Sequence, residues 1–240
     1  MSDITLSPVA VIRTPYKQKF AVPRQPGLVK AAKAELEFLP PYDNPECVRG
    51  IEEFSHLWLL FRFHHTADKG WSPLVRPPRL GGNKRIGVFA TRSTFRPNAM
   101  GLSVVKLLGV EITKGKTKLI LEGADLVDGT PVFDVKPYLP YSDAHPTASG
   151  GYADDRPDTG MTIEFSSAAY KQLAHHQQRL PELKALIEQV LQQDPRPAYK
   201  QGLEGKQSFG MSLYDLNIKY WVDGQITHVT EISTITADTN

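Results

Sequence analysis

The 240-residue sequence lacks the features that are typical of secreted or membrane proteins. Cys47 is its single cysteine, so an internal disulfide is impossible and a cage of thiolate metal ligands is excluded. Its apolar runs fall short of the roughly 20 residues that cross a bilayer. The first 15 residues have neither a basic start nor a continuous apolar segment, unlike a secretory signal. We therefore expect a cytoplasmic protein with no membrane partner.

Motifs for common nucleotide-dependent and hydrolytic chemistries are missing as well. Neither G-x-x-x-x-G-K-[ST] nor a G-x-G-x-x-G after a first strand is present, which argues against P-loop and Rossmann nucleotide sites. H-E-x-x-H and G-x-S-x-G are also absent, so the sequence supports neither a zinc protease nor a serine hydrolase. Hydrolysis of a small phosphate or amide is a further reading, but it lacks an identifiable nucleophile with its base.

Charge is distributed unevenly along the chain. The formal net charge is only +2, yet residues 1–110 hold 16 Lys and Arg against 8 Asp and Glu, while residues 111–240 hold 12 against 18. A basic N-terminal half raises encounter rates with nucleic acid. The charged fraction of 22% and apolar fraction of 40% are ordinary for a globular chain of one or two domains.

Residues 84–101, KRIGVFATRSTFRPNAMG, form the most distinctive stretch of the sequence. Its cations lie among small, hydroxyl-bearing and turn-forming residues, a mixture that is unusual for a core or for plain solvated surface. The apolar run over residues 86–91 predicts a strand that ends near Thr91. The following residues, 92–98, then form a loop.

Two arginines of this loop are the first candidate binding residues. Pro97 favours an extended Arg96, and Gly101 allows a tight turn before the next strand. Arg92 and Arg96 present planar forks that suit a carboxylate or a phosphate. The stretch therefore predicts an anion-binding site. The alternative is that these arginines pair with the chain's own carboxylates.

Apolar runs predict that the first domain is rich in β-structure. The expected strands cover residues 4–12, 36–39, 56–63, 102–110 and 117–123, and residues 45–54 form helical turns capped by Asn44. The run 56–63 is nearly all apolar and aromatic, which fits a strand buried on both faces or one in a barrel wall. Lys114, Gly115 and Lys116 give a turn between the last two strands.

Polar residues follow two of these strands. His64 and His65 point to opposite faces if the chain is extended, which disfavours joint metal ligation. Hydrogen bonding to a ligand and a purely structural role both stay open for them. Asp128 and Gly129 are a strong turn signal, with Asp125 and Asp134 nearby. Spacing alone would make this a β-turn with solvated aspartates.

The composition changes over residues 142–160, which are rich in small, polar and turn-forming types. We expect a first domain over 1–143, a linker over 144–160 and a small α+β domain over 161–240. The second domain should contain a strand over 161–165, helices over 167–179 and 181–193, and a hairpin of 208–222 with 226–235 across Asp223 and Gly224. The expected core positions of its second helix are Leu183, Leu186, Ile187, Val190 and Leu191.

Several motifs resemble one known family. They are residues 21–27 (AVPRQPG), 76–83 (RPPRLGGN), 87–98 (GVFATRSTFRPN), 126–140 (LVDGTPVFDVKPYLP) and 194–199 (DPRPAY). The sequence is similar in them to the TrmO (TsaA-like) family of tRNA adenine N6-methyltransferases. The resemblance implies a mainly β fold, with a single-sheeted β-barrel that binds S-adenosylmethionine and a small α+β C-terminal domain. It also implies a homodimer, and methylation of N6-threonylcarbamoyl-adenosine 3′ of the anticodon in a threonine tRNA, without DNA or metal.

The resemblance also implies site residues. For the cofactor these are Pro23, Arg24, Gln25, His64, His65, Arg92, Leu102, Asp125, Leu126, Val127 and Asp128. Reaction with the substrate would involve Asp128, Arg96, Arg196 and Tyr199. The chain departs from the family's RPNPIG at Ala99 and Met100, and from its common Gln at His65.

Chemistry assigns hypothetical roles to some of these residues. The exocyclic N6 is a poor nucleophile, so catalysis should rest on aligning nitrogen, methyl and sulfur, with an acceptor for the N6 proton. Asp128 or a backbone carbonyl near it is the expected acceptor, and the expected anion contacts are Arg76, Arg79, Arg96 and Arg196. The alternative function is a non-catalytic tRNA-binding or ligand-sensing module that uses the same basic face.

Overall fold

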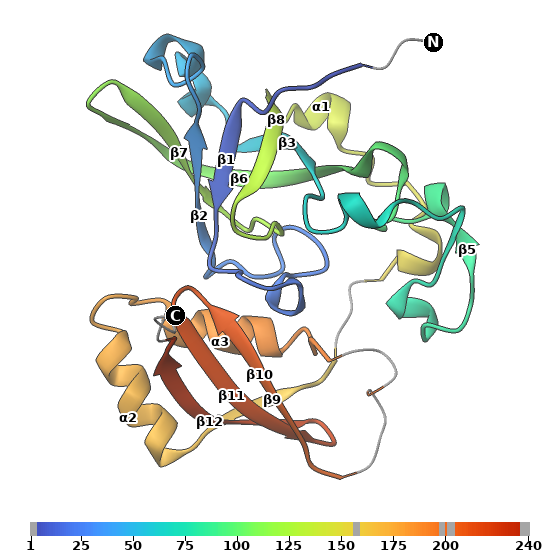
Figure 1. Cartoon of the computed structure of the whole chain (residues 1–240), viewed down its shortest axis with the longest axis vertical. Coiled ribbons are helices and arrows are strands. Elements are labelled where there is room, and N and C mark those ends of the chain that lie inside the picture. The colour runs from blue at the N-terminus through green and yellow to red at the C-terminus, as the bar shows by residue number, and fades with distance from the viewer. Residues whose placement is uncertain (1–3, 156–158, 197–199, 201–204, 236–240) are drawn as a thin grey trace.

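The computed structural model of the chain describes residues 4–155, 159–196, 200 and 205–235. Two β-sheet units follow one another along the chain, and α-helices lie against the second (Figure 1). Within the described residues, no helix combines the length and apolar character that a membrane crossing requires.

The first unit is a closed barrel of six antiparallel strands. In spatial order they are β1 (Ala10–Arg13), β2 (Lys33–Phe38), β7 (Lys116–Glu122), β6 (Met100–Thr113), β3 (His56–Arg62) and β8 (Thr130–Pro137), which pairs with β1 again. This confirms the predicted mainly β fold with a single-sheeted barrel. The first expected strand, 4–12, is much shorter, because its regular ladder with β2 and β8 begins at Ala10.

Strand β3 shows how the barrel core is built. Its residues alternate along the strand, and Leu57, Leu59 and Phe61 are buried while their neighbours are more exposed. A period of two places one face inside the barrel and the other outside. The barrel-wall reading of residues 56–63 is therefore correct, and burial on both faces is wrong. The other strands add Ile12, Leu36, Val105, Leu119, Leu121 and Val132 to this core.

Antiparallel order brings three long connections to one end of the barrel. Strands β1, β3 and β7 end there and β2, β8 and β6 begin there, so residues 14–32, 63–99 and 123–129 meet at this end. We call this end the mouth. The tight turn at Lys114 and Gly115, with φ of 52° and 74°, lies at the opposite end. Ten of the eleven predicted cofactor residues lie in the three connections, and the last, Leu102, is two residues inside β6.

The connections between the barrel strands, and the segment after β8, contain short strands and 3₁₀ turns. They are the strands β4 (Leu74–Val75) and β5 (Ile86–Gly87) and the 3₁₀ turns η1 (Lys19–Ala21), η2 (Pro45–Val48), η3 (Ile51–Glu53), η4 (Ala67–Lys69), η5 (Pro78–Leu80), η6 (Val88–Ala90), η7 (Pro97–Ala99) and η8 (Gly151–Ala153). Asn44 caps η2 as expected, since its side chain accepts a hydrogen bond from the Glu46 amide.

Two expectations for the central stretch were wrong. The strand ends at Gly87, not Thr91, because the Thr91 amide and hydroxyl both donate to the Val88 carbonyl and close a turn. Gly101 makes no turn but lies buried inside β6, where a Cβ would press on the rings of Phe61 and Phe63. The glycine makes room for aromatic rings.

The second unit is a four-stranded sheet with two helices. The elements are β9 (Thr162–Phe165), α2 (Ser167–His176), α3 (Leu183–Leu191), β10 (Gln207–Leu213), β11 (Leu216–Asp223) and β12 (Ile226–Thr234), after the short helix α1 (Pro140–Asp143). Sheet order is β10-β11-β12-β9, and β9 runs parallel to β12. The expected strand 208–222 was wrong, since positive φ at Tyr214 (54°) breaks it into β10 and β11. Both helices are shorter than expected, and the five apolar positions of α3 are buried.

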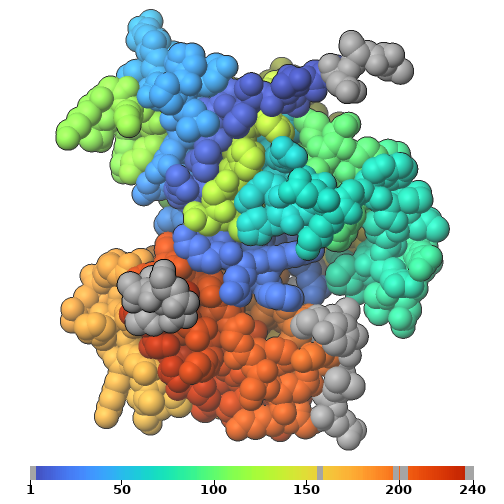
Figure 2. Space-filling model, in the orientation of Figure 1, coloured from blue at the N-terminus to red at the C-terminus, as the bar shows by residue number. Residues whose placement is uncertain are grey.

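The barrel connection 14–32 packs against this second unit (Figures 1 and 2). Tyr16, Val29 and Ala32 share a hydrophobic core with α2, α3 and the sheet. The Tyr214 amide donates to the Pro15 carbonyl at 2.7 Å. Near α3, the Ala31 amide donates to Gln189 Oε1 at 3.0 Å. A segment of the first unit thus helps to form the second core, and the division at 143 and 161 stays a prediction.

Candidate functional site

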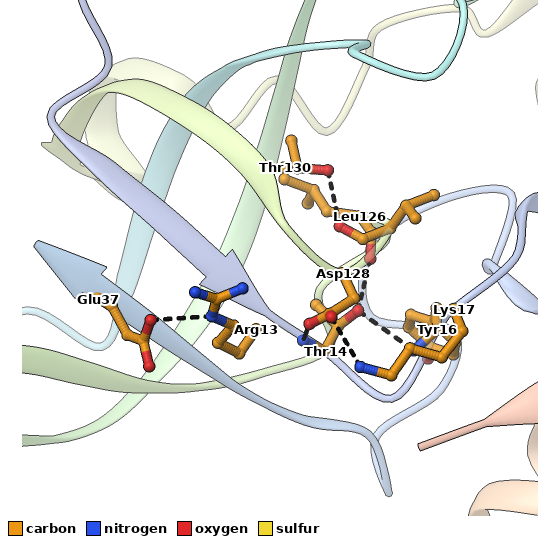
Figure 3. A network of polar contacts seen from close by, with 9 residues as sticks. Arg13, Thr14, Tyr16, Lys17, Glu37, Leu126, Asp128 and Thr130 are labelled. Carbon is orange, nitrogen blue, oxygen red and sulfur yellow. Dashed lines mark hydrogen bonds and ion pairs between the residues drawn. The ribbon is translucent and has the colours of Figure 1, made fainter. Parts of the chain in front are cut away.

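The turn after β7 is fastened to the end of β1 by Asp128 (Figure 3). One carboxylate oxygen accepts the Thr14 amide at 3.0 Å, and the other accepts Lys17 Nζ at 2.7 Å. The Asp128 amide donates to the Tyr16 carbonyl at 2.9 Å. Thr14 Oγ1 adds a bond of 2.9 Å to the carbonyl of Leu126. Asp128 therefore holds two of the mouth connections together, and both of its side-chain oxygens already have donors.

We expect the Asp128→Asn variant to be less stable by about 1 kcal/mol, since it loses a half-exposed ion pair but keeps an oxygen for the Thr14 amide. Urea unfolding at pH 7.5 measures the change. Glu37→Gln is the matched control, because it removes the more exposed pair with Arg13 from the same strand region. Equal losses in both variants would contradict a special role for Asp128.

Asp125 lies in a different environment from Asp128. Ser103 Oγ on β6 donates to its Oδ1 at 2.6 Å. Burial raises the pKa of Asp125 to about 6, against the hydrogen bond from Ser103 and the positive charge of Arg92, which both lower it. A carboxyl group with this pKa takes up and releases protons near neutral pH. Such a perturbed group in a cluster of loops marks a candidate functional site.

Arg92 links the remaining parts of the cluster. Its Nη1 donates a short hydrogen bond to Gln25 Oε1 in the 14–32 connection. Its charge acts on Asp125 in the 123–129 turn. In the same loop, the Phe95 ring lies 5.4 Å from Lys19 Nζ of the 14–32 connection, measured to the ring centre. Gln25, Arg92 and Asp125 thus bring all three mouth connections together.

Arg96 does not present a free fork. Its Nη1 donates to the Thr91 carbonyl at 3.0 Å and, more weakly, to the Ser93 carbonyl at 3.4 Å. The same loop is tightened by Ser93, whose amide donates to Thr91 Oγ1 at 3.1 Å. Arg96 therefore braces the loop that presents Arg92, and its expected contact with an anion stays a prediction.

The two histidines lie on a turn rather than on an extended segment. Their ring centroids are 4.3 Å apart in an edge-to-face arrangement, so the expectation that they point to opposite faces was wrong. Burial, and next the charge of His65, lower the pKa of His64, although nearby Asp128 raises it. His64 is therefore neutral at pH 7 and keeps one nitrogen that accepts a hydrogen bond.

The other predicted residues have separate placements. Pro23 is buried and Arg24 is exposed in the 14–32 connection, while Leu126 is buried under the turn. Leu102 projects outward from β6 with 56% of its surface exposed. Arg196 is buried in the second unit, where Asp194 binds it through bonds of 2.7 and 2.9 Å, and Tyr199 lies outside the described residues.

Ser103 was missed from the sequence, although a signal existed. It occupies an inward-facing position of β6, between the buried Gly101 and Val105. A polar residue at an inward position needs a partner, so it pointed to a buried polar group nearby.

One hollow of about 370 Å³ lies on the outer wall of the barrel beside the mouth. Its lining is Pro26, Gly27, Lys30, His56, Val104, Lys106, Glu122 and Gly123. None of the predicted cofactor residues lines it. The cluster around Gln25, Arg92 and Asp125 is therefore the better candidate site, because titratable and donor groups converge there.

A closed barrel with this cluster at its mouth, followed by an α+β unit, matches one class of tRNA methyltransferases. The sequence model of the tRNA-methyltransferase O N-terminal domain matches residues 11–144, and that of the TrmO C-terminal domain matches residues 158–235. The chain belongs to the tRNA-methyltransferase O family, which confirms the resemblance.

Individual relatives are similar over nearly the whole chain. The tRNA (adenine(37)-N6)-methyltransferase of Escherichia coli K12 is 52% identical over 92% of this chain and 94% of its own. A putative S-adenosylmethionine-dependent methyltransferase, RcsF, of Pseudomonas aeruginosa is 50% identical over 90% and 91%. The crystal structure of TrmO from P. aeruginosa superposes with a TM-score of 0.79 at 40% identity, covering 98% of both chains.

Proposed function

We propose that this protein transfers the methyl group of S-adenosylmethionine to N6 of the threonylcarbamoylated adenosine 3′ of the anticodon in a threonine tRNA. The coarser part follows from the family: the chain is an S-adenosylmethionine-dependent tRNA adenine(37)-N6 methyltransferase. The finer substrate rests on the sequence motifs. Convergence of the three mouth connections on Arg92 is the observation that supports a site there.

The cofactor would lie at the mouth. Its carboxylate suits the exposed guanidinium of Arg92, which Gln25 orients through the short hydrogen bond. Neutral His64 offers an acceptor to hydroxyl or amino groups. When bound, S-adenosylmethionine supplies an electrophilic methyl on a sulfonium. The chain's task is to hold N6 in line with the sulfur–methyl bond and to remove the N6 proton.

Asp125 is the better proton acceptor than Asp128. In the reaction a nitrogen–carbon bond forms, the sulfur–carbon bond breaks, and the N6 proton must leave. The pKa of Asp125 near 6 matches a base that works at neutral pH, whereas Asp128 is occupied by Thr14 and Lys17. Ser103 holds the Asp125 carboxylate in place at 2.6 Å.

A homodimer and a cytoplasmic location complete the proposal. Leu102 projects from the outer face of β6 with 56% of its surface exposed, and Leu108, further along the strand, is 41% exposed. Exposed apolar side chains on a barrel strand are suited to contact with a second copy of the chain. Because Leu102 lies at the mouth end of β6, such a contact would let each copy border the other's site. The tRNA substrate is in keeping with the cytoplasm.

Incubation with labelled S-adenosylmethionine and tRNA tests the proposal. We expect label in threonylcarbamoylated threonine tRNA, and none in an unmodified transcript of the same sequence. Mass spectrometry of the digested tRNA locates the methyl group on the N6-modified base. A stable tRNA complex without methyl transfer would instead favour the non-catalytic binding module.

A further inference from the structure

The 63–99 connection carries exposed apolar side chains beside the mouth. It forms the lobe at the side of the barrel that contains β5 (Figure 1). Phe89 has 78% of its surface exposed, Trp71 59% and Leu74 50%. Single exposed apolar residues are normal on protein surfaces. Three large ones in and beside the short sheet of β4 and β5 mark a candidate binding surface.

Backbone pairing brings the segments that carry these side chains together. Leu74 pairs with Gly87 across β4 and β5, and the Val88 amide donates to the Pro73 carbonyl at 3.0 Å. Phe89 lies in η6, two residues after the end of β5, and the partner strand β4 follows Trp71 in the chain. The Ser72 amide donates to the Phe95 carbonyl at 3.3 Å, which ties the same segment to the loop of Arg92. The apolar group is thus joined to the candidate site through the backbone.

The same connection carries unbalanced positive charge. Between residues 63 and 99 the sequence has seven cations, Lys69, Arg76, Arg79, Lys84, Arg85, Arg92 and Arg96, against one acidic residue, Asp68. None of the seven forms an ion pair within the part of the chain that the structure describes. By contrast, cations on the barrel wall such as Lys33, Lys106 and Lys118 pair with glutamates.

Exposed aromatic rings among unpaired cations suit one kind of partner. Single-stranded nucleic acid offers flat bases that stack on aromatic side chains and phosphates that bind lysine and arginine. A double helix hides the base faces, and an apolar protein surface would leave seven cations without counter-charges. Charge complementarity therefore favours unpaired nucleotides.

We propose that the 63–99 connection is a stacking platform for unpaired anticodon-loop bases next to the adenosine that receives the methyl group. Phe89 and Trp71 stack on bases, and Arg76, Lys84 and Arg85 bind the adjoining phosphates. This inference rests on the proposed function for its RNA, and it adds the residues that select a loop over a helix.

Phe89→Ala tests the platform most directly. We expect the KM for tRNA to rise roughly tenfold, because one base–aromatic stack is lost, while the Kd for S-adenosylmethionine stays unchanged. Trp71→Ala should also raise the KM for tRNA, whereas Phe89→Tyr, which keeps an aromatic ring, should have a KM close to that of the wild type. Tyr141→Ala is the matched control, since Tyr141 is 88% exposed on α1, which follows β8 at the end opposite the mouth.

The salt dependence of tRNA binding provides an independent measurement. The plot of log K against log salt has a negative slope, and the double variant Lys84→Ala, Arg85→Ala should make this slope shallower by roughly 1 to 2, as two phosphate contacts are lost. Phe89→Ala should weaken binding without changing that slope. A KM in Phe89→Ala equal to that of Tyr141→Ala, with an unchanged slope in the double variant, would overturn the platform. A wild-type protein that methylates no tRNA would overturn the proposed function instead.

Discussion

Asp125→Asn is expected to slow methyl transfer to tRNA by roughly 100- to 1,000-fold, the usual loss when a positioned base is removed. Asparagine keeps the shape of the side chain and an oxygen for the Ser103 hydroxyl, so the mouth should stay intact. Single-turnover rates with saturating S-adenosylmethionine isolate the transfer step. The Kd for the cofactor, from calorimetry, should change less than threefold.

The pH dependence of the rate distinguishes a base from a cofactor ligand. The wild-type rate should fall about tenfold per unit below pH 6, because the pKa of Asp125 is about 6. The variant should show no such fall. If the Kd of Asp125→Asn for S-adenosylmethionine rose by the same factor as its transfer rate fell, Asp125 would be a ligand of the cofactor rather than the base.

The same substitution should raise stability at neutral pH. The folded pKa of Asp125, about 6, lies above the unfolded value of about 3.9, so its contribution to stability is fully present below pH 4 and is lost as pH rises through 6. Asparagine does not titrate and avoids this loss. The melting temperature of the variant relative to wild type should therefore be higher at pH 7.5 than at pH 4.5.

Gly101→Ala is expected to destabilise the fold by about 3 kcal/mol. Its Cβ would lie 2.8 Å from Phe63 Cζ, and the ring of Phe61 would be closer still. These rings pack against each other with centroids 5.2 Å apart, so neither can move without disturbing the other. The melting temperature, measured by circular dichroism, should drop by several degrees.

Gly109→Ala on the same strand is the control for this prediction. A Cβ there meets nothing within 4 Å, so the change should be small. Combining Gly101→Ala with Phe61→Leu should cost less than the sum of the two single changes, because the smaller side chain leaves room. Additive losses would place the strain somewhere other than the Phe61 ring.

Elements with a strong local pattern were predictable from the sequence. The apolar run of β3, the five buried positions of α3 and the turns at Gly115 and Gly129 follow from periodicity and turn chemistry. The strand expected over 86–91 failed because hydrogen bonds from Thr91 to Val88 closed a turn that apolar content does not reveal. Similarly, the residues around Tyr214 include no glycine or asparagine directly before or after it that would predict its positive φ.

The sequence predicted which residues belong to the candidate site better than it predicted what each residue does there. The family resemblance implied Gln25, Arg92 and Asp125, and the topology brings their connections to one end of the barrel. Their interactions depend on partners distant in sequence: Gln25 with Arg92, Ser103 with Asp125, and Lys17 with Asp128. Burial, which raises the pKa of Asp125, has no counterpart in the local sequence.

The packing of residues 14–32 on the second unit bears on how the protein is made. All six barrel strands have been synthesised once Pro137 leaves the ribosome, whereas the surface that holds Tyr16 and Ala31 includes Leu213 and Gln189. Domains generally fold from the N-terminus during synthesis, so we expect the barrel wall to form first. At that stage the connection that carries Gln25 has no second unit to pack against. A product cut short after the barrel would have a folded wall, but its 14–32 connection, which carries Gln25, would lack the core that it shares with α2, α3 and the second sheet.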